Sequence, residues 1–112
     1  MAKLITFTQG DAGMIITANI LDENKKPLQI GYSDKIKGHL QYPNGTCIDM
    51  LDECVTIINR DEAKIRITIA PEYAEMDGFY QIFIQVLTDT YRITATKSID
   101  YYVNAKHNIG AH

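Results

Sequence analysis

Two stretches in the second half of the chain alternate apolar and polar residues with a period of two. Every second residue is apolar between Lys64 and Ala70, and again between Phe79 and Thr88. The residues of shared parity are Ile65, Ile67 and Ile69 in the first stretch and Tyr80, Ile82, Ile84 and Val86 in the second. Such spacing places side chains on one face of a β-strand. The pattern predicts two strands that bury facing apolar stripes.

The start of the second stretch carries a further signal, because Gly78-Phe79-Tyr80 opens the strand. A tyrosine at this place is similar to the tyrosine corner of immunoglobulin-type sandwiches, whose hydroxyl bonds back to the preceding loop. We therefore expect the Tyr80 hydroxyl to bind the loop before it. Residues 72–77 are compatible with a single helical turn ahead of this corner.

Shorter stretches with the same alternation follow one another along most of the chain. Further strands are predicted over residues 5–8, 14–20, 35–42, 46–51, 55–57 and 91–103, with a brief extended piece at 28–30. Asn44-Gly45 supplies the positive φ angles of a two-residue hairpin turn, so the strands beside it are expected to pair antiparallel. Pro27 is expected in a loop or at an edge. Lys97 interrupts an apolar parity, which predicts a bulge or a place at the sheet margin.

About eight short strands separated by turns predict an all-β domain. The expected fold is an immunoglobulin-like antiparallel β-sandwich of about seven to nine strands. It would span residues 1–104, with 105–112 as a flexible C-terminal tail. A small closed barrel is the alternative architecture. The chain has no tryptophan, and Ile82 stands where an antibody-type domain carries its second cysteine, so an antibody-type domain is excluded.

Composition narrows the classes of partner. A chain of 112 residues suits one domain and buries enough surface to fold without metals or disulfides. Its formal net charge is −3, and no lysine or arginine run would neutralise several phosphates, so no nucleic-acid partner is expected. No stretch approaches the ~18 apolar residues of a membrane helix, and the N-terminal apolar run is too short for a signal peptide. We therefore expect the chain to be synthesised in a cytoplasm and to have no contact with a membrane.

The residues that usually carry chemistry form no convincing constellation. Cys47 and Cys54 stand seven apart and are expected as free thiols, although they would meet across a hairpin. The histidines His39, His107 and His112 have no zinc-site spacing, and Asp49, Asp52 and Glu53 lack the order that wraps a calcium ion. The expectation is no metal and no cofactor.

Catalytic and modification motifs are equally weak. His39 lies on the polar parity of its strand, where an exposed histidine is expected, and no nucleophile with an orienting group can be nominated beside it. Asn44-Gly45-Thr46 fits the glycosylation pattern, but the hairpin turn explains the same residues. We expect no enzymatic activity.

One surface stands out on the strand over 79–88. Its outward parity carries Phe79, Phe83 and Leu87 beside two glutamines, which is unusually apolar for a solvent face. Such a stripe marks either a partner surface or a face covered by a loop. These three residues are the candidate interaction surface.

The order of motifs also resembles a known family. The motifs are Phe7-Thr8-Gln9-Gly10-Asp11-x-Gly13, the turn from Asp22 to Pro27-Leu28, Tyr42-Pro43-Asn44-Gly45, and Gly78-x-Tyr80 before a long strand. Over residues 5–103 this series resembles the immunoglobulin-like N-terminal domain of bacteriophage baseplate upper proteins. The chain departs from the full-length pattern because it stops without a helical or receptor-holding region.

The resemblance implies a structural protein of the phage tail or baseplate that mediates assembly through protein–protein contacts. It implies other tail and baseplate proteins as partners, with a homo-oligomer also possible. The location would be the virion, with the host cytoplasm during assembly. The alternative is a carbohydrate-binding or adhesive module, for which the candidate stacking residues are Tyr32, Tyr42, Tyr73, Tyr91 and Tyr102.

Overall fold

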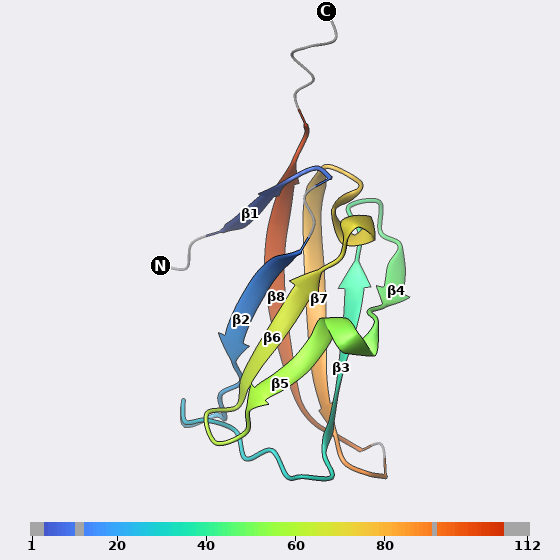
Figure 1. The fold of residues 1–112 in the computed structure, drawn as a ribbon. Coiled ribbons are helices and arrows are strands. Elements are labelled where there is room, and N and C mark those ends of the chain that lie inside the picture. The colour runs from blue at the N-terminus through green and yellow to red at the C-terminus, as the bar shows by residue number, and fades with distance from the viewer. Residues whose placement is uncertain (1–3, 11–12, 91, 107–112) are drawn as a thin grey trace, which may run out of the picture.

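The computed structural model describes residues 4–10, 13–90 and 92–106, and these form two β-sheets packed face to face (Figure 1). The strands are β1 (Ile5–Thr8), β2 (Met14–Asn19), β3 (Lys35–Gln41), β4 (Cys47–Asp49), β5 (Val55–Asn59), β6 (Lys64–Ile69), β7 (Gly78–Leu87) and β8 (Ile93–Asn104). Two single-turn 3₁₀ helices complete the described elements: η1 (Asp52–Cys54) and η2 (Pro71–Ala74). The predicted all-β sandwich is confirmed.

The larger sheet has the order β1-β8-β7-β3-β4, so β7 lies at its centre. Its strands pair antiparallel except β1, which runs parallel to the last four residues of β8. The sequence pattern predicted antiparallel pairing throughout. A parallel pair needs a long crossover connection, and here the rest of the domain separates β1 from β8 along the chain. The alternation of residues within β1 does not show whether β1 runs parallel or antiparallel to β8.

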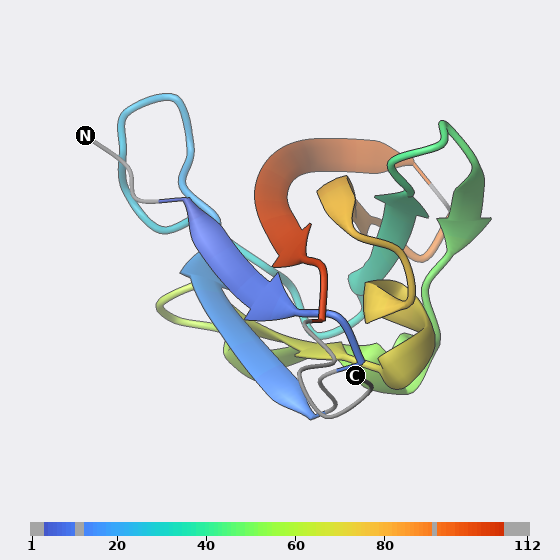
Figure 2. The same cartoon turned by 90° about the horizontal axis from the view of Figure 1, so that it is seen from above.

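The smaller sheet has the order β2-β6-β5, with all pairs antiparallel. Viewed from above, β2, β6 and β5 lie along one side of the sandwich and β7, β3 and β4 along the other (Figure 2). Ile65, Ile67 and Ile69 on the central strand β6 are fully buried, as their shared parity predicted. The two sheets therefore bury facing apolar stripes.

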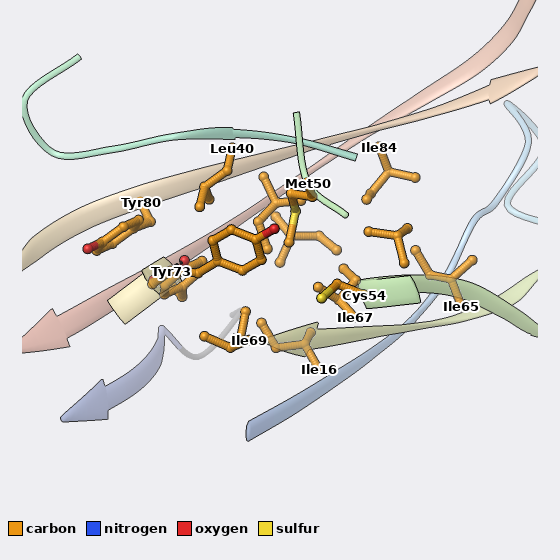
Figure 3. Packing of buried hydrophobic residues seen from close by; sticks show 14 of the residues in the cluster. Ile16, Leu40, Met50, Cys54, Ile65, Ile67, Ile69, Tyr73, Tyr80 and Ile84 are labelled. Carbon is orange, nitrogen blue, oxygen red and sulfur yellow. Dashed lines mark hydrogen bonds between the residues drawn. The ribbon is translucent and has the colours of Figure 1, made fainter. Parts of the chain in front are cut away.

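Aliphatic side chains from both sheets meet in one core (Figure 3). Leu40 and Ile84 point inward from the larger sheet, opposite Ile16 and Ile67 of the smaller one. Gly38 on β3 keeps the sheets close, because a Cβ atom there would lie 2.8 Å from Cγ2 of Val55 and 3.2 Å from the Met50 sulfur. The spacing of the two layers depends on this missing side chain.

The tyrosine corner is confirmed. The Tyr80 hydroxyl accepts a hydrogen bond from the backbone N–H of Met76 at 3.0 Å and donates one to the carbonyl of Met76 at 2.9 Å. The Tyr80 ring stacks on that of Tyr101, with centroids 4.8 Å apart and an interplanar angle of 6°. The backbone that the corner tyrosine holds lies four positions before it, so the loop before β7 is fixed to the strand.

The segment from η2 to the corner is held more extensively than the corner alone requires. Five consecutive carbonyls, from residue 72 to residue 76, each accept a hydrogen bond from outside the segment at 2.5 to 3.1 Å. The donors are, in that order, the hydroxyls of Tyr42 and Tyr101, the backbone N–H of Gly10, the side chain of Gln9 and the Tyr80 hydroxyl. A helical turn was predicted at 72–77, and it occurs slightly earlier, as η2 at Pro71–Ala74. Residues outside the segment hold it in place.

The hairpin between β3 and β4 forms as predicted, but its turn differs. Tyr42 accepts a hydrogen bond from the N–H of Gly45 at 2.9 Å, and Tyr42 N–H donates to Thr46 at 2.7 Å, which leaves a three-residue loop. Only Gly45 has a positive φ, of 89°, in this loop. A two-residue turn at Asn44-Gly45 would pair Pro43 with Thr46, and proline has no N–H to donate to that pair. Pro43 instead fixes a negative φ at the first position of a turn over residues 42–45, which favours a type I turn closed by the glycine.

Several smaller predictions can also be placed. Leu28 and Ile30 form no strand, although Ile30 is buried and the Leu28 N–H donates to the Ile20 carbonyl. Pro27 lies in the loop after β2, as expected. Lys97 pairs with Ile84 within an unbroken part of the ladder, so no bulge occurs there. It lies at the sheet margin, because among the described residues β1 pairs only with positions 101–104 of β8.

The ends of the chain are described only in part. Of the predicted tail, Ala105 and Lys106 are within the described residues, and the Lys106 N–H donates to the Gln9 side chain at 3.3 Å. Residues 107–112, and with them the predicted fraying, lie outside the described residues. Within the described residues, no helix is long and apolar enough to cross a membrane.

Candidate interaction surface

The outer face of the larger sheet carries the surface that the sequence singled out. Phe79 is 59% exposed and Phe83 is 36% exposed, so both predicted residues of β7 face solvent. Leu87 is only 7% exposed, and this part of the prediction is wrong. The pairing of β7 with β8 shifts register between Val86 and Leu87, and both residues are buried. A bulge breaks the alternation, so parity no longer reports which face Leu87 occupies.

The two exposed phenylalanines have different surroundings. Phe79 packs edge to face against Tyr102 of β8, with ring centroids 4.9 Å apart and an interplanar angle of 76°. Phe83 lies in a row between His39 of β3 and Ser98 of β8. A second row lies between Phe79 and Phe83. It consists of Gln41, Gln81 and Asp100, one residue from each of three adjacent strands. The face is therefore apolar at two points and polar in between.

His39 is held on both sides in this face. Its Nδ1 lies 2.7 Å from an Asp49 carboxylate oxygen, and its Nε2 lies 3.0 Å from the side-chain oxygen of Gln85. The sequence predicted an exposed strand histidine, whereas the side chain is 33% exposed and bonded at both nitrogens. To activate a nucleophile as a general base, the histidine would need one ring nitrogen free to accept a proton. The arrangement occupies both ring nitrogens and fixes the ring beside Phe83.

A groove opens beside Phe79 at the end of the outer face near the β3–β4 hairpin. We call it the Gln81 groove; it has a volume of about 340 Å³. It is lined by the row Gln41, Gln81 and Asp100 and by Phe79, Tyr42, Pro43 and Tyr80. Pro43 leans on the glycine that opens β7, since a Cβ atom on Gly78 would lie 2.8 Å from the Pro43 Cβ. The hairpin is thus fixed against the strand.

Two of the residues that line this groove, Tyr42 and Tyr80, have raised pKa values. Burial, together with the smaller effects of the nearby Tyr80, Glu75, Tyr73 and Glu72, raises the pKa of Tyr42 to about 12. Burial also raises the pKa of Tyr80, and the charges of Glu75 and Asp77 act in the same direction against its hydrogen bond with Met76. Both rings belong to the buried tyrosine stack, since Tyr42 packs on Tyr80 at 5.3 Å and Tyr80 stacks on Tyr101, so these charges act on the inner side of the sheet and not on the outer face.

The remaining candidate residues are dispersed. Cys47 is exposed, Cys54 is buried, and both are free thiols; burial raises the pKa of Cys54. Asp49 pairs with His39, and among the described residues no group of three His, Cys, Asp or Glu side chains could hold a metal ion. The Asn44 side chain accepts a hydrogen bond from the Thr46 N–H at 3.0 Å, as expected for a turn residue.

The five tyrosines named for sugar stacking do not form one platform. Tyr73 is 2% exposed and belongs to the core, so it is excluded as a stacking residue. Tyr32 is 95% exposed and lies near the Arg60 guanidinium, 5.7 Å from its ring centre. Tyr42 and Tyr102 are half-buried on the larger sheet, and Tyr91 lies outside the described residues.

Sequence reasoning missed the pairing of His39 with Asp49 and the alignment of Gln41, Gln81 and Asp100. Both depend on register between strands, which alternation within one strand does not define. A three-residue loop after Tyr42 would have given the first, because it places Asp49 opposite His39. The second also requires the order of β3, β7 and β8 in the sheet.

Comparison with known proteins adds a likeness of fold. No model of a protein family matches the chain, and no curated protein matches it in sequence. A solved structure, the N-terminal domain of phage TP901-1 ORF48, is similar with a TM-score of 0.65 and 9% sequence identity. The similarity covers 94% of this chain and 86% of that chain. The chain therefore shares its two-sheet sandwich fold with a domain of a phage protein.

Proposed function

We propose that this chain is a non-enzymatic structural domain of a phage tail or baseplate, which assembles with other virion proteins through protein–protein contacts. The observation that carries the proposal is the fold similarity to the N-terminal domain of phage TP901-1 ORF48 over 94% of the chain. The series of motifs that resembles baseplate upper proteins supports it independently. We further propose that the sandwich is of the immunoglobulin type, a reading that the Tyr80 corner supports.

The outer face of the larger sheet is the proposed contact surface. Phe79 and Phe83 expose aromatic area there, and buried aromatic residues contribute strongly to protein interfaces. Their neighbours are already ordered: Phe79 by Tyr102, and His39 beside Phe83 by Asp49 and Gln85. A surface fixed before binding loses little side-chain entropy on contact. Rigid docking by this face is the mechanism that the geometry supports.

The proposed partners are other tail or baseplate proteins, with a second copy of the chain as a further arrangement. In a virion, several copies in fixed positions would strengthen weak individual contacts by raising the effective concentration. The proposed location is the phage particle, with the host cytoplasm during assembly. No step of this mechanism uses a metal, a cofactor or a proton transfer.

The test is the presence of the chain in purified virions of the phage that encodes it. We expect mass spectrometry to find it in intact particles after density-gradient purification. The variant Phe79→Ala/Phe83→Ala should fold with an unchanged circular dichroism spectrum and be incorporated at a markedly lower level. Ile15→Ala is the matched control, because Ile15 is 55% exposed on the other sheet. Absence of the unmodified chain from particles would defeat the proposal.

A further inference from the structure

The Gln81 groove combines three planar polar side chains with an aromatic wall. Gln41, Gln81 and Asp100 lie side by side on β3, β7 and β8, about 5 Å apart as neighbours in a sheet. Two of them end in an amide with one carbonyl oxygen, and the third is a carboxylate, so each offers an acceptor. Phe79 rises beside this row and is steadied by Tyr102. The site thus presents acceptors next to an exposed ring.

The charge around the groove has one sign. Asp100 is the one charged residue among those lining the groove, and none of them is basic. The groove is suited to a cation and unsuited to an anion.

The shape of the acceptor set distinguishes between cations. A guanidinium group is planar, donates several hydrogen bonds in a fixed fork to a carboxylate, and stacks on aromatic rings. An ammonium group is a compact charge that keeps its water more strongly. A guanidinium group beside Phe79 would donate several hydrogen bonds to the row of acceptors and stack on the ring at the same time. A lysine ammonium group would make only some of these contacts.

We infer that the Gln81 groove seats an arginine side chain presented by a neighbouring virion protein. The guanidinium would lie against Phe79, donate to the Asp100 carboxylate, and reach the side-chain oxygens of Gln81 and Gln41. This inference rests on the assembly function proposed above and names the chemistry of the partner at one end of the contact face. A pocket of about 340 Å³ is at the small end of ligand sites, which suits one inserted side chain.

The experiment uses the full chain and a blocked tri-arginine peptide as the probe, followed by ¹H–¹⁵N NMR at low salt. We expect saturable shifts centred on Gln41, Phe79, Gln81 and Asp100, with binding in the millimolar range that weakens as salt is added. Blocked tri-lysine should bind several-fold more weakly. Asp100→Asn should raise the dissociation constant for tri-arginine about tenfold, because a charge-assisted pair is lost.

Asp89→Asn is the matched control, since it removes the same charge from an exposed turn between β7 and β8 and should leave the dissociation constant unchanged. Equal binding of the two peptides, or equal effects of the two aspartate variants, would overturn the inference and indicate only diffuse attraction. Measuring the incorporation of variants into virions distinguishes a failure of the arginine inference from a failure of the assembly proposal. If Asp100→Asn is incorporated normally while Phe79→Ala/Phe83→Ala is not, the arginine seat is wrong and the assembly role stands.

Discussion

At the scale of single residues, Tyr80 joins a strand to the loop that precedes it. Its hydroxyl accepts one hydrogen bond from Met76 and donates another to the same residue. We expect Tyr80→Phe to lower the free energy of unfolding by about 0.5 to 1.5 kcal/mol, because it removes the hydrogen bonds of the corner hydroxyl. The ring, and its stacking on Tyr101, would remain.

Urea unfolding followed by circular dichroism measures this cost, with the slope of the transition expected to stay constant. Tyr32→Phe is the control that removes the same atom from a ring that is 95% exposed, and it should leave the midpoint where it was. Equal midpoints for the two variants would mean that the corner contributes nothing to stability.

The tyrosine hydroxyls also make stability depend on alkaline pH. Burial raises the pKa of Tyr42 to about 12 and raises the pKa of Tyr73, Tyr80 and Tyr101. In the unfolded chain tyrosine ionises near pH 10, so above that pH the unfolded state binds fewer protons than the folded state. Stability is therefore complete below pH of about 10 and falls as pH rises through the window up to about 12.

Absorbance of tyrosinate and far-ultraviolet circular dichroism, recorded against pH on the same sample, test this dependence. The four tyrosines with a raised pKa should ionise together with the loss of β structure. Their ionisation near pH 10 in a chain that keeps its native spectrum would contradict the prediction.

At the scale of elements, alternation predicted the strands well but not their register. Ile65, Ile67 and Ile69 are buried as their spacing required, because parity within one strand depends only on backbone geometry. A two-residue turn at Asn44-Gly45 would have placed Met50 opposite His39, whereas the observed loop places Asp49 there. One residue of loop length exchanges the faces of the returning strand, so the polar pair on the outer face could not be read from alternation.

Contacts between β3 and β5 limit how closely the two sheets pack. A methyl group on Gly38 would lie 2.8 Å from Val55, which is closer than real contacts permit. We expect Gly38→Ala to cost about 1 to 3 kcal/mol through overpacking of the core. The double variant Gly38→Ala/Val55→Ala relieves that contact, so the glycine substitution should cost less in the Val55→Ala background. A thermodynamic cycle from urea unfolding measures the difference, and additive costs would show that the two strands do not limit each other.

At the scale of the whole molecule, the sandwich leaves part of β8 open. Among the described residues, no strand pairs with the outer edge of β8 over positions 93–100. Such an edge can pair with another chain, and an inward-facing lysine is a known safeguard because pairing would bury its charge. Lys97 is half-buried on the inward parity of this stretch. It therefore disfavours association through this edge.

Replacing this lysine should open the edge to self-association. We expect Lys97→Val to form concentration-dependent dimers or larger species in sedimentation velocity, while the unmodified chain keeps its state at the same concentrations, because the variant edge is apolar, β-prone and uncharged. Lys64→Val is the matched control, since Lys64 lies on the central strand β6 between Asn19 of β2 and Asn59 of β5 and exposes no free edge. Association of both variants to the same extent would point to lost surface charge as the cause. Association of Lys97→Val alone would locate the effect at the β8 edge.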